Sequence, residues 1–210
     1  MRRIPTALIL TVCAYGWWTG PASAPVLASE AASEPAPSGA HGVMTSYYDS
    51  GGVEWERRYQ NGRQDGVTRK YFENGKLQGE STFADGRLDG VFKTYFESGG
   101  LESELSYRDD HLEGPSRFYY ESGALKREVA FIGGAREGAA RDFYEDGQVK
   151  AEWTYSKDLL NGESKLYYES GTLRALAVFV SGKRHGPLRM FQPDGRLLEV
   201  QEFEEGKRVK

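Results

Sequence analysis

Several residue types that would define a chemical site are scarce in this chain of 210 residues. It has one cysteine, Cys13, which excludes a disulfide scaffold and a cysteine-based zinc site. Its three histidines, His41, His111 and His185, are widely spaced and give little material for a metal centre. The formal net charge is −4, whereas nucleic-acid binders are normally basic. We therefore expect no metal, no cofactor and no nucleic-acid partner.

Long hydrophobic runs are also scarce, and hydrophobic residues make up only 39% of the chain. Two residue types are abundant instead: 26 glycines, and aromatic residues at 13%. A disordered chain is usually poor in aromatics, so this composition indicates a folded protein. Much glycine together with much tyrosine and phenylalanine predicts short strands joined by many tight turns.

The N-terminal segment has the organisation of an export signal. Arg2 and Arg3 precede a short apolar stretch, and small residues follow it up to Ala28. We predict a signal peptide over residues 1–28 and an exported protein, periplasmic or extracellular. A retained anchor, or lipoprotein anchoring at Cys13, is the alternative. Residues 29–41 are rich in Ala, Ser, Glu and Pro, and they predict a flexible linker.

Residues 42–210 repeat with a period of 24 residues and without insertion or deletion. Glycine occupies position 1 and position 10 of all seven units. The units begin at Gly42, Gly66, Gly90, Gly114, Gly138, Gly162 and Gly186. Aromatic or branched aliphatic residues fill positions 6, 12 and 18 of each unit, as Tyr71, Leu77 and Phe83 do in the second. A fixed period of this length indicates a repeat architecture.

Each unit reads as a β-hairpin, because strand-forming residues flank a three-residue turn that ends in glycine. We predict an all-β fold: an elongated antiparallel meander of about seven hairpins and fourteen strands. In the expected register, position 6 pairs with 12, position 4 with 14 and position 3 with 15. The even positions would then share one face, which would carry all three apolar columns.

These residues resemble the MORN-repeat family in its bacterial second variant. The pattern is carried by Gly66, Tyr71-Phe72-Glu73, Gly75, Leu77, Glu80 and Phe83, and it recurs from residue 42 to about 206. Proteins of this kind are often labelled YwqK-like antitoxins. The resemblance implies a protein-binding scaffold and no catalytic activity.

One column of the repeat is basic in six units, at position 4. It consists of Arg69, Lys93, Arg117, Arg141, Lys165 and Arg189. It is a candidate track for phosphate or lipid head groups; the alternative is solubility and cross-strand pairing with the nearby acidic columns. Position 7 is aromatic in six units, and it either forms a stacking platform for a ligand or covers the sheet beside the turn.

The last two units depart from the pattern, because position 15 changes from Glu to Leu176 and Val200. In the expected register the face opposite the apolar columns becomes apolar there, which predicts a patch for a partner or for self-association. Its members are Leu166, Tyr168, Leu176, Val178, Leu188, Met190, Leu198 and Val200. The alternatives are an end cap or cover by the N-terminal tail.

No set of residues suggests catalysis, because the histidines fall at unrelated positions and the carboxylates recur with the period. The preferred function is therefore an exported scaffold that binds an unidentified protein, or itself, through a sheet face. A carbohydrate or cell-wall binder, an anionic membrane-surface binder and an antitoxin-like neutraliser are the alternatives.

Overall fold

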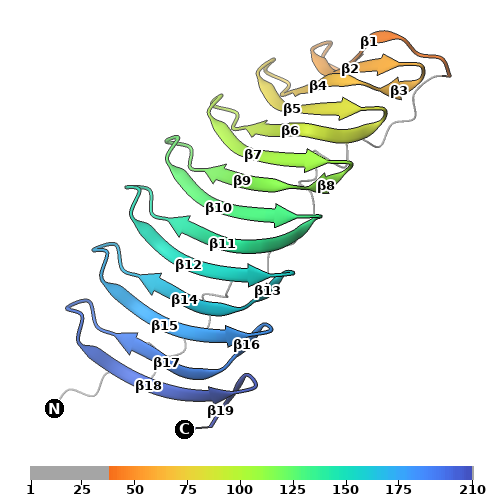
Figure 1. Ribbon diagram of the computed structural model, residues 1–210. Coiled ribbons are helices and arrows are strands. Elements are labelled where there is room, and N and C mark those ends of the chain that lie inside the picture. Colours follow the sequence, from red (N-terminus) through yellow and green to blue (C-terminus); the bar gives the residue numbers. More distant parts are fainter. Residues whose placement is uncertain (1–37, 210) are drawn as a thin grey trace.

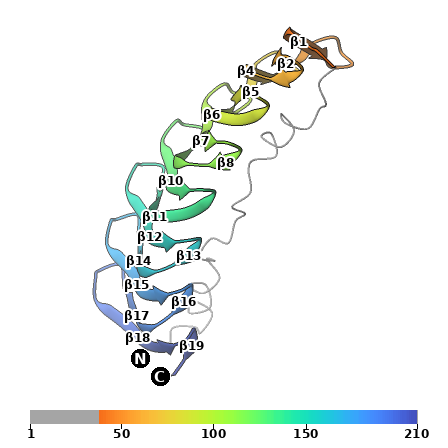
Figure 2. The same ribbon diagram turned by 45° about the vertical axis from the view of Figure 1, so that its right-hand side comes forward.

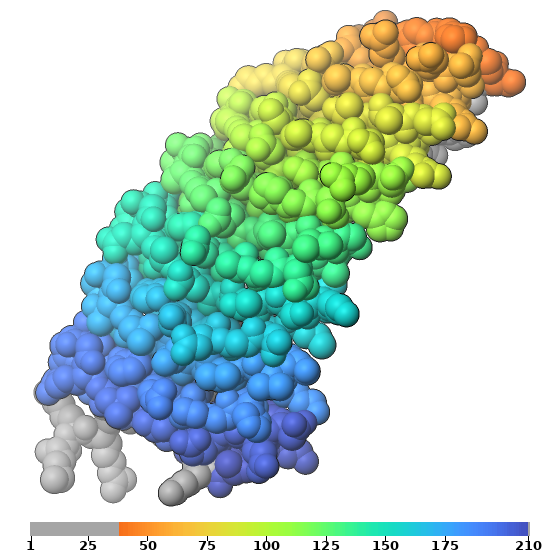
Figure 3. Space-filling view, in the orientation of Figure 1, coloured from red at the N-terminus to blue at the C-terminus, as the bar shows by residue number. Residues whose placement is uncertain are grey.

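The computed structural model describes residues 38–209, and over this range the chain is all-β without helices. The signal peptide predicted over residues 1–28, Cys13 and most of the linker lie outside the described residues. One sheet of 19 strands runs in chain order along an elongated, gently curved body (Figures 1 and 3). The strands bend along their length, and successive hairpins stack side by side (Figure 2).

Two kinds of strand alternate along the sheet. The arm that follows each hairpin turn is one strand: β2 (Val53–Gln60), β5 (Leu77–Ala84), β7 (Leu101–Arg108), β10 (Leu125–Ile132), β12 (Val149–Ser156), β15 (Leu173–Val180) and β18 (Leu197–Glu204). The arm that precedes it is β1 (Gly42–Tyr47), β4 (Gly66–Tyr71), β6 (Arg87–Tyr95), β9 (Gly114–Tyr119), β11 (Ala135–Phe143), β14 (Gly162–Tyr167) or β17 (Gly186–Phe191). Short strands lead into four of these arms or close the array: β3 (Arg63–Gln64), β8 (His111–Leu112), β13 (Leu159–Leu160), β16 (Lys183–Arg184) and β19 (Lys207–Arg208).

These strands confirm the predicted meander of hairpins. Each arm that follows a hairpin turn pairs antiparallel with the arm before it, and all of them except β18 also pair with the next arm, as β5 does with β4 and β6. The fourteen expected arms become 19 strands, because four first arms are interrupted just before the glycine at position 1 and β19 adds a final short strand.

The turns between units explain where the repeat tolerates a residue other than glycine. Positions 20 and 21 both have positive φ, which is the requirement of a two-residue type I′ turn. Asp110 and Asp158 replace the usual glycine at position 21, with φ of 67° and 68°. Their carboxylates accept hydrogen bonds from the backbone N–H of Leu88 and Arg136 in the preceding unit. The aspartates therefore join neighbouring units.

The predicted register is wrong beyond the first pair. Tyr71 does pair with Leu77, but Lys70 then pairs with Gly79 and Arg69 with Glu80. A β-bulge at position 13 inserts one extra residue, so position 4 faces position 15 and position 3 faces position 16. A shift of one residue moves every later side chain to the other face.

The bulge defines two faces. The inner face carries positions 3, 5, 14, 16, 18 and 23. Most side chains at positions 3, 14, 16 and 18 are buried. The outer face carries positions 2, 4, 6, 12, 15 and 17. The apolar column at position 18 lies in the core, with Phe83 only 2% exposed. The columns at positions 6 and 12 lie on the opposite, outer face, where Tyr47 is 62% and Leu197 is 55% exposed. The three apolar columns therefore do not share a face.

The core is a row of side chains along the inner face. One buried cluster extends from Trp55 to Tyr155, and a second surrounds Phe179. Leu160 and Leu166 pack against both clusters, so the row is continuous. Each unit is stabilised by its neighbours, as in other quasi-one-dimensional repeat proteins.

A hydroxyl group joins neighbouring units at position 7. The Tyr144 hydroxyl donates to the backbone carbonyl of Tyr167, one unit further on, over 2.8 Å. Tyr48, Tyr120 and Tyr168 make the same bond to Tyr71, Phe143 and Phe191. The aromatic column at position 7 therefore has a structural role.

We expect Tyr144→Phe to lower the free energy of unfolding by about 1 kcal/mol, because a hydrogen bond to the backbone is lost. Phe96→Tyr should have the opposite sign, because it adds the hydroxyl at the equivalent position. Tyr107→Phe is the control: burial raises the pKa of Tyr107 to about 12, and its buried hydroxyl makes no hydrogen bond within residues 38–209. Urea unfolding midpoints measure all three, and equal losses for Tyr144→Phe and Tyr107→Phe would contradict this assignment.

Candidate functional site

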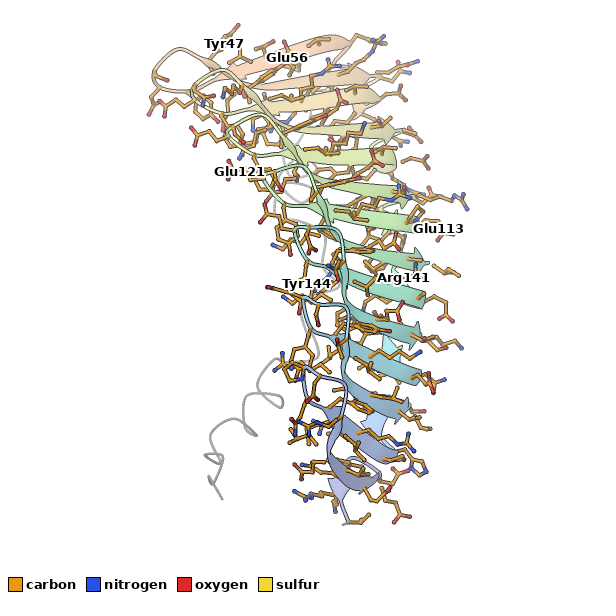
Figure 4. All side chains as sticks on the ribbon, turned by 90° about the vertical axis from the view of Figure 1, so that its left-hand side faces the viewer. Tyr47, Glu56, Glu113, Glu121, Arg141 and Tyr144 are labelled. Carbon is orange, nitrogen blue, oxygen red and sulfur yellow. The ribbon has the colours of Figure 1, made fainter. Side chains whose placement is uncertain are left out.

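A ladder of alternating charges runs across the outer face. Position 4 of each unit lies between position 15 of its own unit and position 15 of the unit before, so Arg141 lies between Glu128 and Glu152. Both distances from the guanidinium of Arg141 to these carboxylates are 3.2 Å. Figure 4 shows Arg141 away from Glu121 and Tyr144, which lie at the margin of the hairpin turns.

The same ladder holds three other basic residues of this column, Arg69, Lys93 and Arg117. Arg69 pairs with Glu80 at 3.0 Å, while Lys93 and Arg117 both approach Glu104, at 3.6 and 3.8 Å. The tyrosines at position 6 add to it, since Tyr71 and Tyr167 donate to Glu56 and Glu152. The six residues predicted as an anion-facing column thus do share a face, with the carboxylates of position 15 interleaved among them.

The ladder breaks at the C-terminal end, on β15, β17 and β18. Leu176 and Val200 stand on either side of Arg189, where the other units have glutamates. Lys165 still pairs with Glu163 at 3.2 Å. Arg189 is exposed and has no ion pair with any of residues 38–209. It is the one residue of its column in this situation.

Leu176 and Val200 flank Arg189 on the outer face, and further apolar side chains lie along the same face. We define the C-terminal outer patch by Leu176, Val178, Val180, Leu197 and Val200. Val180, Leu197 and Val200 are 49%, 55% and 43% exposed. A cluster of exposed apolar side chains around one arginine is typical of interaction surfaces.

The register separates the eight residues predicted as one partner patch. Leu176, Val178 and Val200 belong to the C-terminal outer patch. Leu188 and Met190 are 5% exposed in the inner core, and Leu166 packs against both core clusters. Tyr168 donates its hydroxyl to the backbone carbonyl of Phe191, and Leu198 stands at the bulge, 48% exposed. The outer face at this end also carries Val180, Leu197 and Arg189, which the predicted patch did not include.

Cations cover the position-7 tyrosines in the middle of the chain. Position 13 holds Glu54, Gln78 and Glu102 in the first three units, and Lys126, Lys150 and Arg174 in the next three. These three cations lie over the rings of Tyr120, Tyr144 and Tyr168, 5.4 to 5.6 Å from the ring centroids. The contacts are cation–π interactions, which stabilise the margin beside the hairpin turns.

A hollow of about 450 Å³ opens beside this row. Its lining is aromatic and charged: Phe96, Phe118, Tyr119, Tyr120, Phe143, Glu102, Lys126, Lys150, Arg127 and Asp142. Arg127 and Asp142 form a two-pronged ion pair, with N–O distances of 2.5 and 2.6 Å and side chains 21% and 18% exposed. Sequence reasoning missed this pair, although a charge at positions 14 and 5 departs from the mostly small or apolar residues there in neighbouring units.

A second charged pair joins units at the opposite margin. Burial acts to raise the pKa of Asp158, but hydrogen bonds and charge from Arg136 outweigh it and hold this pKa below the ordinary value of 3.8. The Arg136 Nε to Asp158 Oδ1 distance is 2.9 Å, and the Arg136 guanidinium also lies 4.4 Å from the ring centroid of Tyr155. This pair belongs to the turn architecture.

Within residues 38–209, no group of three or more histidine, cysteine, aspartate or glutamate side chains is placed to hold a metal ion. The same range contains no helix with the length and apolar character that a membrane span requires.

Taken together, an open sheet of stacked hairpins with one shared core row is a repeat scaffold, whose binding surfaces are its faces. The family model described as a MORN repeat variant matches residues 64–85, 88–109, 112–132, 136–157 and 160–180. The chain belongs to this MORN-repeat family. Such repeats are generally protein-binding or membrane-binding scaffolds, and the family is non-enzymatic. The units that begin at Gly42 and Gly186 lie outside the matched ranges.

No curated protein matches the chain. Among solved structures, it is similar to a crystal structure of a TarM mutant from S. aureus in complex with fondaparinux, alpha-GlcNAc-glycerol and UDP. The identity is 14% and the TM-score is 0.32; the match covers 46% of this chain and 19% of that one.

We expect Asp158→Asn to reduce the acid sensitivity of the fold. A carboxyl group whose pKa is lowered on folding adds stability above its unfolded pKa, and this contribution disappears as the pH falls through the folded pKa. The asparagine variant should be less stable than wild type at neutral pH, and the two should converge as the pH falls below 3.8 and through the lowered pKa of Asp158. Urea midpoints at several pH values measure this, and a constant difference at every pH would contradict it.

Proposed function

We propose that this protein is an exported, non-catalytic repeat scaffold that binds a protein partner through the C-terminal outer patch. The observation that carries the proposal is the break in the charge ladder at Leu176 and Val200. Over the rest of the outer face the column-4 cations are in ion pairs, four of them with column-15 carboxylates, and burying such pairs costs desolvation. At the C-terminal end a partner would instead cover apolar side chains around one arginine, a residue enriched at binding hot spots.

Export rests on the sequence of residues 1–28, and the family's scaffold role supports the absence of catalysis. An antitoxin-like neutraliser would be one form of this function, with a toxin as the partner. Binding to an anionic membrane through position 4 has less support, because five of its six cations are in ion pairs. A cation that is already paired with a carboxylate attracts an anionic lipid head group less strongly.

We expect Leu176→Glu combined with Val200→Glu to abolish capture of the specific partner, because two charges would enter the apolar contact. The measurement is affinity purification from the native host with wild type and variant as baits, compared by quantitative mass spectrometry. Val67→Glu combined with Val91→Glu is the matched control, since these outer-face valines are 38% and 42% exposed and lie far from the patch. Identical captured proteins for all three baits would overturn the proposal.

The hollow beside Arg127 and Asp142 favours a second candidate function, binding to an acidic carbohydrate of the cell wall. Aromatic rings and a fixed arginine–carboxylate pair are polar and apolar groups of the kind that line ligand sites. Lys126 and Lys150 are exposed at its rim and make no ion pair with the described residues. They could pair with carboxylates of such a polymer.

We expect Lys126→Glu combined with Lys150→Glu to reduce sedimentation with purified cell wall at least about tenfold, since both rim charges reverse. Lys157→Glu combined with Lys207→Glu is the control, because it makes the same change of charge away from the hollow. Cell-wall binding that is absent in wild type, or equal in both variants, would eliminate this second candidate.

A further inference from the structure

We propose that the partner of the C-terminal outer patch is a second copy of this chain, and that two copies pack patch against patch about a twofold axis near Val200. This inference rests on the proposed function and names the occupant of the same surface. Beside the patch, on the same outer face, lie a cation and a carboxylate whose side chains make no ion pair with any of residues 38–209.

The cation is Arg189 on β17 and the carboxylate is Glu202 on β18. Glu202 stands at position 17, where the six earlier units have no acidic residue. Its cross-strand neighbour is Pro187, whereas Arg189 faces Val200. Arg189 and Glu202 are therefore diagonal neighbours on one face, about 7–8 Å apart. No ion pair joins them, and neither side chain forms an ion pair with any other of residues 38–209.

A twofold axis satisfies both charges at once. In an isologous interface, a contact from residue i to residue j recurs as j to i. Val200 lies between the two charges, opposite Arg189 and two residues before Glu202. If the axis passes near Val200, each Arg189 meets Glu202 of the second copy, and two ion pairs form.

The apolar side chains fit the same arrangement. Val178 and Val180 of β15 lie on the same face as the charged pair, and each would contact apolar groups of the second copy. Elsewhere on the outer face, patch-to-patch packing would bury the column-4 and column-15 ion pairs of both copies at a desolvation cost. The C-terminal end is the segment of the ladder where two outer faces can meet without that cost. We therefore assign this end to self-association.

Charge reversal tests the pairing directly. We expect sedimentation velocity of the full-length chain to show a concentration-dependent dimer. Arg189→Glu and Glu202→Arg should each raise its dissociation constant at least about tenfold. The double variant, which exchanges the two charges, should return to within about threefold of wild type. Arg141→Glu is the control, because it changes the same charge within the paired ladder, and it should leave dimerisation unchanged.

A cross-link tests the axis independently. In a Cys13→Ser background, Val200→Cys should form a disulfide between two copies at low micromolar concentration, since a residue on the axis meets itself. Val91→Cys, equally exposed on the outer face, should not. A wild-type chain that stays monomeric up to about 100 μM, or a double variant as weak as the single ones, overturns the inference. If partner capture still depends on Leu176 and Val200 in that case, the proposed function stands and only the second copy is excluded.

Discussion

The structure depends on the β-bulge at position 13, because a single-layer sheet can bury its apolar side chains on one face only. The bulge adds one residue to the second arm of each hairpin, so positions 14, 16 and 18 join position 3 on the inner face. It also places position 15 opposite position 4, which creates the charge ladder of the outer face. Core and ladder are thus two consequences of one inserted residue, repeated every 24 residues.

The sequence was sufficient to predict the architecture, but it was insufficient to predict which residues lie on each face of the sheet. Glycine spacing and the columns at positions 6, 12 and 18 predict seven hairpins, and the strands confirm this. They could not reveal the bulge, because Gln78 or Lys126 at position 13 looks like any polar strand residue. Because side chains alternate between the two faces, the one-residue error in the register assigned every later side chain to the opposite face. The residues of the predicted apolar patch are therefore divided between the core and the surface. Leu188 and Met190 were assigned to the wrong face for this reason alone.

Other features could be read from the sequence in part. The six residues of the basic column share a face because they occupy one repeat position, but their interleaving with Glu80, Glu104 and Glu128 depends on the register. Arg127 and Asp142 break their columns visibly, yet they are 15 residues apart in the chain. Their pairing becomes apparent only when β10 and β11 are known to lie side by side.

A regular array also constrains where specificity can arise. A residue that recurs in each unit contributes the same inter-unit contact each time, as the tyrosines of position 7 do with the backbone carbonyl one unit further on. Such contacts extend the scaffold but distinguish no place along it. A partner that binds at one place must recognise a departure from the period. Two such departures among the described residues are the Arg127–Asp142 pair beside its hollow and the apolar residues Leu176 and Val200 on either side of Arg189. The second places an arginine and a glutamate that make no ion pair with residues 38–209 on one sheet face, and under the proposal made above this charge pattern is what would let the C-terminal end select a partner.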